Sequence, residues 1–285
     1  MSALPSPGAP GASAALPASG LEAGLRRLHL PTVRRHYAEL ERQAAAESWS
    51  YPEYLERLVL LEIEHRTETR IARATHQAGF PFLKTLEEFD FTFQKSIQRK
   101  ALGPYLGPEL VSGGRCLILA GPPGVGKTAL CIALAYKAIQ HGAEARFVTC
   151  TDLIHQLTEA RSRGQWSAVL ARYLEPHVLI IDEVGYLGYG PDAASVLFPV
   201  IDQRYLKGNR PVLLTTNKDP QQWGQVLHDP DLSAAILDRL LHRGEVLKLS
   251  GRSYRQYRPG QPPPAEPGFP ETLSGIPSRD EKAQR

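Results

Sequence analysis

The chain has 285 residues, of which 42% are hydrophobic, and its formal net charge is +3. This length and composition predict one sizeable core with a smaller appended domain. The mild charge argues against a uniformly basic nucleic-acid coat protein, although it permits local basic patches. No run approaches about 18 apolar residues, and the N-terminus lacks the basic and aliphatic regions of a secretion signal. We therefore expect a cytoplasmic protein in which Cys116, Cys131 and Cys150 are small, reduced, buried hydrophobes.

Composition and pattern divide the chain into four segments. The tails are low in complexity or rich in proline, which predicts disorder, whereas the two middle segments carry helical and then alternating strand-helix patterns. We expect a disordered tail (1–20), a helical domain (21–95), an α/β domain with a parallel sheet (96–258) and a second disordered tail (259–285).

The most informative motif is a glycine-rich loop that follows the apolar run 116–120 and opens the helical pattern 128–140. Its glycines let backbone N–H groups surround phosphates, Lys127 can reach the β- and γ-phosphates, and Thr128 can ligate Mg²⁺. The alternative is an ordinary strand-to-helix turn, but the strand before and the helix after favour phosphate binding. The stretch predicted to bind ATP comprises Gly121, Pro122, Pro123, Gly124, Val125, Gly126, Lys127, Thr128 and Ala129.

A second apolar strand, 177–181, ends in two carboxylates. Ligands of open α/β sheets lie at the carboxyl ends of parallel strands, so Asp182 is expected to hold Mg²⁺. Glu183 is expected to orient or deprotonate the attacking water. A surface turn before Gly185 is the alternative. Beside a complete phosphate loop, the pair predicts Mg²⁺-dependent hydrolysis of ATP.

Three further polar residues are candidates for the same site. Asn217 follows the apolar run 211–216 and could position the water, or it could simply form a turn. Arg239, on the helical pattern 231–243, could reach a neighbouring subunit's nucleotide, and Arg255 could sense the nucleotide of its own subunit. Each arginine could instead be a surface residue, with Asp238 as a local ion-pair partner for Arg239.

The motifs occur in the order GPPGVGKT, VLIIDE, LLTTN, ILDRLLH and GRSYR. This order resembles the IstB-like helper ATPases of insertion-sequence transposition, an AAA+ branch close to DnaC-type helicase loaders, over residues 21–255. The resemblance implies an α/β AAA+ P-loop NTPase core, with a parallel sheet flanked by helices, after a small all-helical N-terminal domain. It also implies nucleotide and hydrolysis roles for Lys127, Thr128, Asp182, Glu183 and Asn217, a trans-acting finger role for Arg239 and a second sensor role for Arg255.

The same resemblance implies that the protein forms a homo-oligomer with ATP on duplex DNA and recruits or activates a transposase. Two alternatives stay open, namely a loader of a replicative helicase and a nucleotide-gated adaptor whose hydrolysis is incidental. A small-molecule kinase fits less well, because Glu183 and Asn217 suit activation of water.

Candidate DNA contacts are the least specific part of the sequence. Basic residues at helical spacing could bind phosphates, or they could form salt bridges with glutamates such as Glu62, four residues before Arg66. The helical segment offers Arg66, Arg70 and Arg73, and near Tyr37 it offers Arg26, Arg27, Arg34 and Arg35. The core offers Arg161, Arg163 and Lys207, which we expect in loops.

Overall fold

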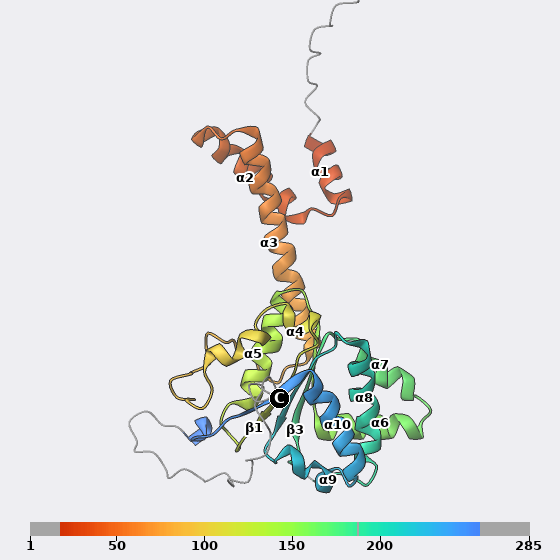
Figure 1. Ribbon diagram of the computed structural model, residues 1–285. Helices are drawn as coiled ribbons and strands as arrows, with labels where there is room; N and C mark the ends of the chain where they lie inside the picture. Colours follow the sequence, from red (N-terminus) through yellow and green to blue (C-terminus); the bar gives the residue numbers. More distant parts are fainter. Residues whose placement is uncertain (1–17, 187, 257–285) are drawn as a thin grey trace, which may run out of the picture. The chain divides into compact units, whose positions relative to one another are not determined.

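The computed structural model of the protein describes residues 18–186 and 188–256 (Figure 1). The second predicted disordered tail, 259–285, and most of the first, 1–20, lie outside the described residues. Residues 18–20 are a correction to the first tail, because they begin the helix α1 (Ala18–Arg27).

The contacts of the chain divide it into two compact units, residues 1–70 and residues 71–285. The boundary between the units lies within one long helix, α3 (Tyr51–Ala78). The first part of α3 contributes side chains to the core of the first unit, and its last part contributes side chains to the core of the second. The domain boundary expected from the sequence, between residues 95 and 96, stays a prediction.

The first unit consists of α1, α2 (Pro31–Glu47) and the first part of α3. Its small core contains Leu25, Val33 and Leu58. The buried Glu62 carboxylate on α3 accepts hydrogen bonds from the N–H groups of Thr32 and Val33, at 2.9 and 3.2 Å. It thereby caps α2, which has no side-chain cap of its own.

The second unit is built on a five-stranded sheet in the order β2-β3-β4-β1-β5, and every neighbouring pair is parallel. The strand bounds are β1 (Cys116–Ala120), β2 (Ala145–Thr149), β3 (Val178–Val184), β4 (Val212–Thr216) and β5 (Gly244–Lys248). This arrangement confirms the predicted parallel α/β core.

Helices cover both faces of this sheet (Figure 1). Alternate residues of β1 enter two different clusters: Ile118 packs with residues of α6, α7, α8 and α10, whereas Leu117 and Leu119 pack with α5 and the segment before β1. Burial on both sides explains why the strands are continuously apolar.

The longer helices are α5 (Lys127–Gln140), α6 (Cys150–Ser162), α7 (Trp166–Leu174), α8 (Ala193–Lys207) and α10 (Pro230–His242). The short ones are α4 (Glu109–Ser112), α9 (Trp223–Val226), η1 (Arg99–Tyr105), η2 (Pro220–Gln222) and η3 (Tyr254–Gln256).

The sheet brings the predicted functional residues together at the carboxyl ends of its strands. The glycine-rich loop follows β1, Asp182 and Glu183 lie near the end of β3, and Asn217 follows β4. These three strands are neighbours, so their carboxyl ends meet.

Two expectations from composition can be compared with the described residues. No helix among them has the length and apolar character needed to cross a membrane. The three cysteines are buried with free thiols, and burial raises the pKa of each thiol above its usual value.

Candidate functional site

The glycine-rich loop after β1 is tightly enclosed by the segment that follows β5. A Cβ atom on Gly121 would lie 2.0 Å from the carbonyl oxygen of Leu249, and one on Gly124 would lie 2.0 Å from the hydroxyl oxygen of Ser253. Gly124 also has a φ of 80°, in the left-handed region that other residues avoid. The loop can therefore keep this conformation only with glycine at both positions.

Two distant segments bind the loop by hydrogen bonds. The Gln94 side-chain amide donates to the carbonyl oxygen of Val125 at 2.9 Å, and the N–H of Tyr254 donates to the carbonyl oxygen of Gly124 at 2.8 Å. Gln94 is 3% exposed and lies 31 positions before Val125 in the sequence. Sequence reasoning missed Gln94, because one glutamine in a loop carries no spacing signal.

Lys127 begins α5 and turns back onto its own loop. Its ammonium group donates to the carbonyl oxygens of Gly121 and Pro122, at 2.7 and 2.8 Å. Burial, assisted by the charge of Arg255, lowers the pKa of Lys127 to about 8, although the carboxylate of Asp182 partly opposes this shift. A poorly hydrated cation at a helix N-terminus is a strong attractor for phosphate.

Asp182 is connected to helix α5 and to the neighbouring strand β4. Its carboxylate accepts hydrogen bonds from the hydroxyl of Thr128, at 2.9 and 3.1 Å to the two oxygens, and from the hydroxyl of Thr215 at 2.5 Å. Asp182 is 5% exposed and Thr215 is 1% exposed. The structure thus brings together Thr128 and Asp182, the two predicted Mg²⁺ ligands. Sequence reasoning missed Thr215, which orients the carboxylate.

Glu183 differs from Asp182 in exposure and in backbone conformation. Its side chain is exposed and its φ is 61°, an uncommon value for a residue other than glycine. Two contacts hold this conformation: the N–H of Glu183 donates to the Thr215 hydroxyl at 2.9 Å, and the Tyr189 hydroxyl donates to the Glu183 carbonyl oxygen at 3.1 Å. The backbone therefore places two consecutive carboxylates in different environments, one buried and one facing solvent.

Asn217 follows β4, two positions after Thr215. Its side-chain oxygen Oδ1 is buried and has no hydrogen-bond partner among the described residues. A buried amide oxygen without a partner is costly, and it fits a polar ligand or a water molecule at this position. The structure thus places Asn217 at the same carboxyl end of the sheet as Asp182.

Arg255 and Arg239 lie in different places. Arg255 belongs to η3 beside the loop, where its charge acts on the pKa of Lys127. Arg239 lies near the end of α10, and its ion-pair partner among the described residues is Asp202 on α8, at 2.5 Å from Nε, rather than the neighbouring Asp238. The expected local pair is thus replaced by a contact between two helices.

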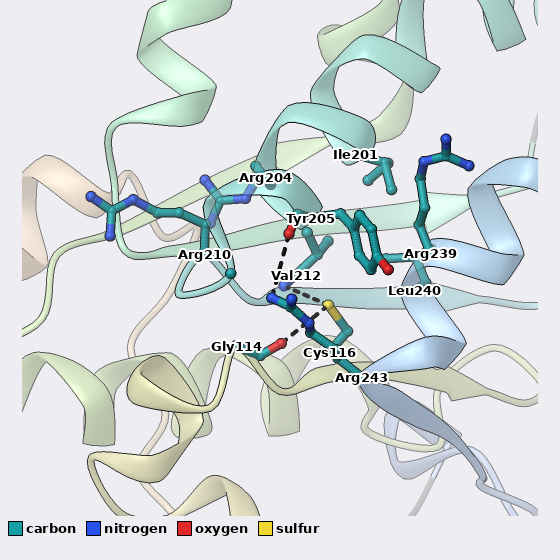
Figure 2. A pocket seen from close by; sticks show the side chains of 11 residues that line it. Gly114, Cys116, Ile201, Arg204, Tyr205, Arg210, Val212, Arg239, Leu240 and Arg243 are labelled. Atoms are coloured by element: carbon teal, nitrogen blue, oxygen red, sulfur yellow. Dashed lines mark hydrogen bonds between the residues drawn. The ribbon is translucent and has the colours of Figure 1, made fainter.

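Arg239 lines a small cavity at the amino ends of β1 and β4, together with three other arginines (Figure 2). Arg204 is 1% exposed, and its guanidinium donates to the carbonyl oxygens of Tyr173, Pro176, His177 and Pro211. Arg243 donates to the carbonyl oxygen of Tyr205 at 3.4 Å and lies over the Tyr205 ring. The fourth arginine is Arg210.

Several candidate DNA-binding residues are engaged within the chain. Arg66 donates to Glu62 and to the carbonyl oxygen of His29, and Arg163 pairs with Glu159 at 2.8 Å. Arg161 lies over the Trp166 ring and bonds to Ser195, and Lys207 donates to the carbonyl oxygen of Leu174. Arg161 and Lys207 are in the last turns of α6 and α8, so their expected placement in loops is wrong. Of the remaining candidates, Arg26, Arg27, Arg34, Arg35 and Arg70 in the first unit and Arg73 in the second unit are exposed.

Comparison with known proteins gives one family match and many related sequences. The model of the family described as IstB-like ATP binding protein matches residues 23–260. A protein described as an ATP-binding protein of insertion sequence IS5376, from Geobacillus stearothermophilus, is 37% identical over 80% of this chain and 90% of its own length. The corresponding protein of insertion sequence IS21 from Pseudomonas aeruginosa is 39% identical over 82% of this chain and 88% of its own.

Solved structures resemble the chain more weakly. The DnaC helicase loader is 20% identical, with a TM-score of 0.44 over 53% of this chain and 85% of that chain. AMPPCP-bound DnaA from Aquifex aeolicus is 20% identical, with a TM-score of 0.48 over 60% of this chain and 51% of that chain. Similarity at this level is not evidence of a shared partner.

Proposed function

The chain belongs to the family of IstB-like ATP-binding proteins, and we propose that it is a Mg²⁺-dependent ATPase that assembles on duplex DNA and recruits or activates a transposase. The observation that supports hydrolysis best is the connected set of Thr128, Asp182, Thr215 and Glu183. The Thr215 hydroxyl donates to the Asp182 carboxylate and accepts a hydrogen bond from the backbone N–H of Glu183. These two bonds fix the position of the Asp182 carboxylate relative to the backbone of Glu183.

The residues divide the work on ATP. The loop amides, the N-terminus of α5 and Lys127 bind the triphosphate. Arg255 adds positive charge near the loop. Glu183, with its exposed carboxylate, orients a water molecule and accepts its proton, and the amide of Asn217 holds the same water by its unpaired oxygen.

The oxygen donors of Thr128 and Asp182 fit a Mg²⁺ ion, which prefers hydroxyl and carboxylate ligands and keeps several of its waters. When bound, Mg²⁺ supplies neutralisation of the charge that develops on the phosphate oxygens. Thr215 would keep one Asp182 oxygen hydrogen-bonded, so that the carboxylate cannot rotate away.

Arg239 is proposed to act on a neighbouring subunit. It shares a cavity with Gly114 and Cys116, before and at the start of β1, whereas the phosphate loop follows the end of β1. A strand of this length spans roughly 15 Å, so Arg239 lies at the opposite end of the sheet from its own loop. An arginine in this position is too far from its own phosphate loop to act there, so it can contribute to hydrolysis only at the nucleotide of an adjacent subunit. The proposed role of Arg239 therefore requires that the protein forms a homo-oligomer with ATP.

The proposed DNA contact uses the exposed arginines of the first unit, chiefly Arg26, Arg27, Arg34 and Arg35. Arg66 is less suited, because Glu62 already neutralises it: burial alone would raise the pKa of Glu62, but Arg66 and the amides of Thr32 and Val33 lower it overall. Contacts through arginine to phosphate give little sequence preference. The role in transposition is supported by the relatives, which are described as proteins of insertion sequences.

The experiment measures ATP turnover and binding to duplexes of increasing length at several salt concentrations, with ATP, ADP or no nucleotide. We expect ATP to tighten binding more on longer duplexes, since assembly aligns many weak sites, and we expect binding to weaken steeply with salt. Affinity independent of length, salt and nucleotide would contradict the proposal. Capture of the Glu183→Gln protein on DNA with ATP then identifies the partner protein. A replicative helicase in place of a transposase would overturn the proposed role in transposition.

A further inference from the structure

The guanidinium of Arg239 is fixed by contacts to two helices. Its Nε donates to Asp202 Oδ1 at 2.5 Å, and its Nη1 donates to the carbonyl oxygen of Ala235 at 3.1 Å. The group also lies 4.7 Å from the centre of the Phe198 ring. In Figure 2 the Arg239 side chain points away from Gly114 and Cys116, whereas the Arg243 guanidinium lies close to them.

These contacts leave one part of the arginine available. Among the described residues, Nη2 of Arg239 has no hydrogen-bond partner, although Nε and Nη1 both do. The side chain is 26% exposed, so it is held mostly within the protein while its tip reaches solvent. An arginine that must contact a phosphate of another subunit needs a fixed stem and a free tip.

Asp202 is itself on a rigid part of the fold. It lies on α8, two positions before Arg204, whose guanidinium bonds to the carbonyl oxygens of four residues around the starts of β3 and β4. These bonds tie α8 directly to the strands that carry Asp182 and precede Asn217. The position of Asp202 is therefore determined by the same sheet that forms the nucleotide site.

We propose that Asp202 is a positioning residue that holds Arg239 in the orientation needed to reach the nucleotide of the adjacent subunit. This inference rests on the proposed trans role of Arg239. Asp202 touches neither nucleotide. It restricts the rotation of Arg239 before subunits meet, so that the interface does not have to order a long, flexible side chain during each turnover.

The test compares ATP turnover of Asp202→Asn and Asp202→Ala with that of wild type, in the presence of duplex DNA. Since a misplaced catalytic group can cost up to about 100-fold in rate, we expect kcat to fall about 10- to 100-fold for Asp202→Ala, with little change in KM. Asp202→Asn keeps an oxygen acceptor and should retain part of the rate. The matched control is Glu159→Ala, which removes the carboxylate of a different ion pair and should leave kcat unchanged.

Mixing experiments separate positioning from a general loss of structure. Asp202→Ala has an intact nucleotide pocket, so mixing with Lys127→Ala, which supplies a correctly held Arg239, should restore turnover. Mixing with Arg239→Ala should not restore it, because no subunit then presents a held arginine. The inference is overturned if Lys127→Ala fails to rescue Asp202→Ala, or if both Asp202 variants turn over at the wild-type rate. The trans role itself fails if a mixture of Arg239→Ala and Lys127→Ala recovers no turnover although the two variants co-assemble, so the two failures are distinguishable.

Discussion

The two ends of the β-sheet use their charged residues in opposite ways. At the carboxyl end, the side chains that can act on a ligand are partly unsatisfied, as in the exposed Glu183 and the unpartnered Oδ1 of Asn217. At the amino end, Arg204 gives four hydrogen bonds to the protein's own carbonyl oxygens and Arg239 is paired with Asp202. One end is prepared to receive a ligand, and the other is held rigid by internal bonds.

The difference explains how one sheet can serve two sites. Groups that bind a nucleotide need free hydrogen-bonding capacity, whereas an arginine presented to another subunit needs a fixed stem. The exposure of the two catalytic candidates agrees with this division, because Glu183 is exposed and Arg239 is mostly enclosed. Variants at the two ends should therefore have distinct effects.

The largest expected effect is on turnover at the carboxyl end. Glu183→Gln should bind ATP normally but lose about 10²- to 10⁴-fold in kcat, because the amide cannot accept the proton of the attacking water. Nucleotide affinity and single-turnover rates would be measured side by side. Glu175→Gln, at an exposed site after α7, is the control. Normal turnover in Glu183→Gln would remove this residue from the mechanism.

At the amino end, Arg204→Met should reduce stability rather than ATP affinity. The substitution leaves the carbonyl oxygens of Tyr173, Pro176, His177 and Pro211 without their partner, at a cost of about 2–4 kcal/mol in the free energy of unfolding. Urea unfolding measures this loss. Arg210→Met should cost less, because Arg210 lines the same cavity but its hydrogen bonds within the described part of the chain go to Asn209 alone. A folded Arg204→Met protein with weakened ATP binding would show that the two ends are coupled.

A smaller effect follows from the protonation of Lys127. Burial, with the charge of Arg255, lowers its pKa to about 8, so the ammonium loses its proton as pH rises through about 8 in the ATP-free protein. Because ATP binds the charged form, its affinity should be constant below that pH and fall above it, by up to about tenfold per pH unit. Isothermal titration between pH 7 and pH 9.5 measures this dependence. The residual affinity of Lys127→Ala should be independent of pH, and the same decline in that variant would assign it to another group.

The sequence predicted the carboxyl end of the sheet better than the amino end. The loop, Asp182, Glu183 and Asn217 each follow an apolar strand, and this local pattern is enough to place them together in a parallel sheet. Arg239 and Asp202 are 37 positions apart on different helices, and only the packing of α10 against α8 brings them together. The nearest carboxylate in sequence, Asp238, was therefore the wrong partner.

The same limit applies to other long-range contacts. Gln94 reaches the carbonyl of Val125 across 31 positions, and Glu62 caps α2 across 30. In each case the residue belongs to no motif and its distance in sequence from its partner matches no helix or strand period. The contact therefore depends on tertiary structure alone. The helical spacing predicts Glu62 as a partner for Arg66, and the structure shows that Glu62 also caps a helix.

The most direct test of the account is a mixture of Arg239→Ala and Lys127→Ala in equal amounts with ATP and duplex DNA. Each variant alone should be inactive, since one lacks the arginine and the other binds ATP too weakly to turn it over. With random assembly, half of the pockets are intact and half of those face an intact arginine, so the mixture should recover about one quarter of the wild-type turnover. No recovery, in mixtures where co-assembly of the two folded variants is verified, would contradict the assignment of the two ends of the sheet to two different subunits' sites.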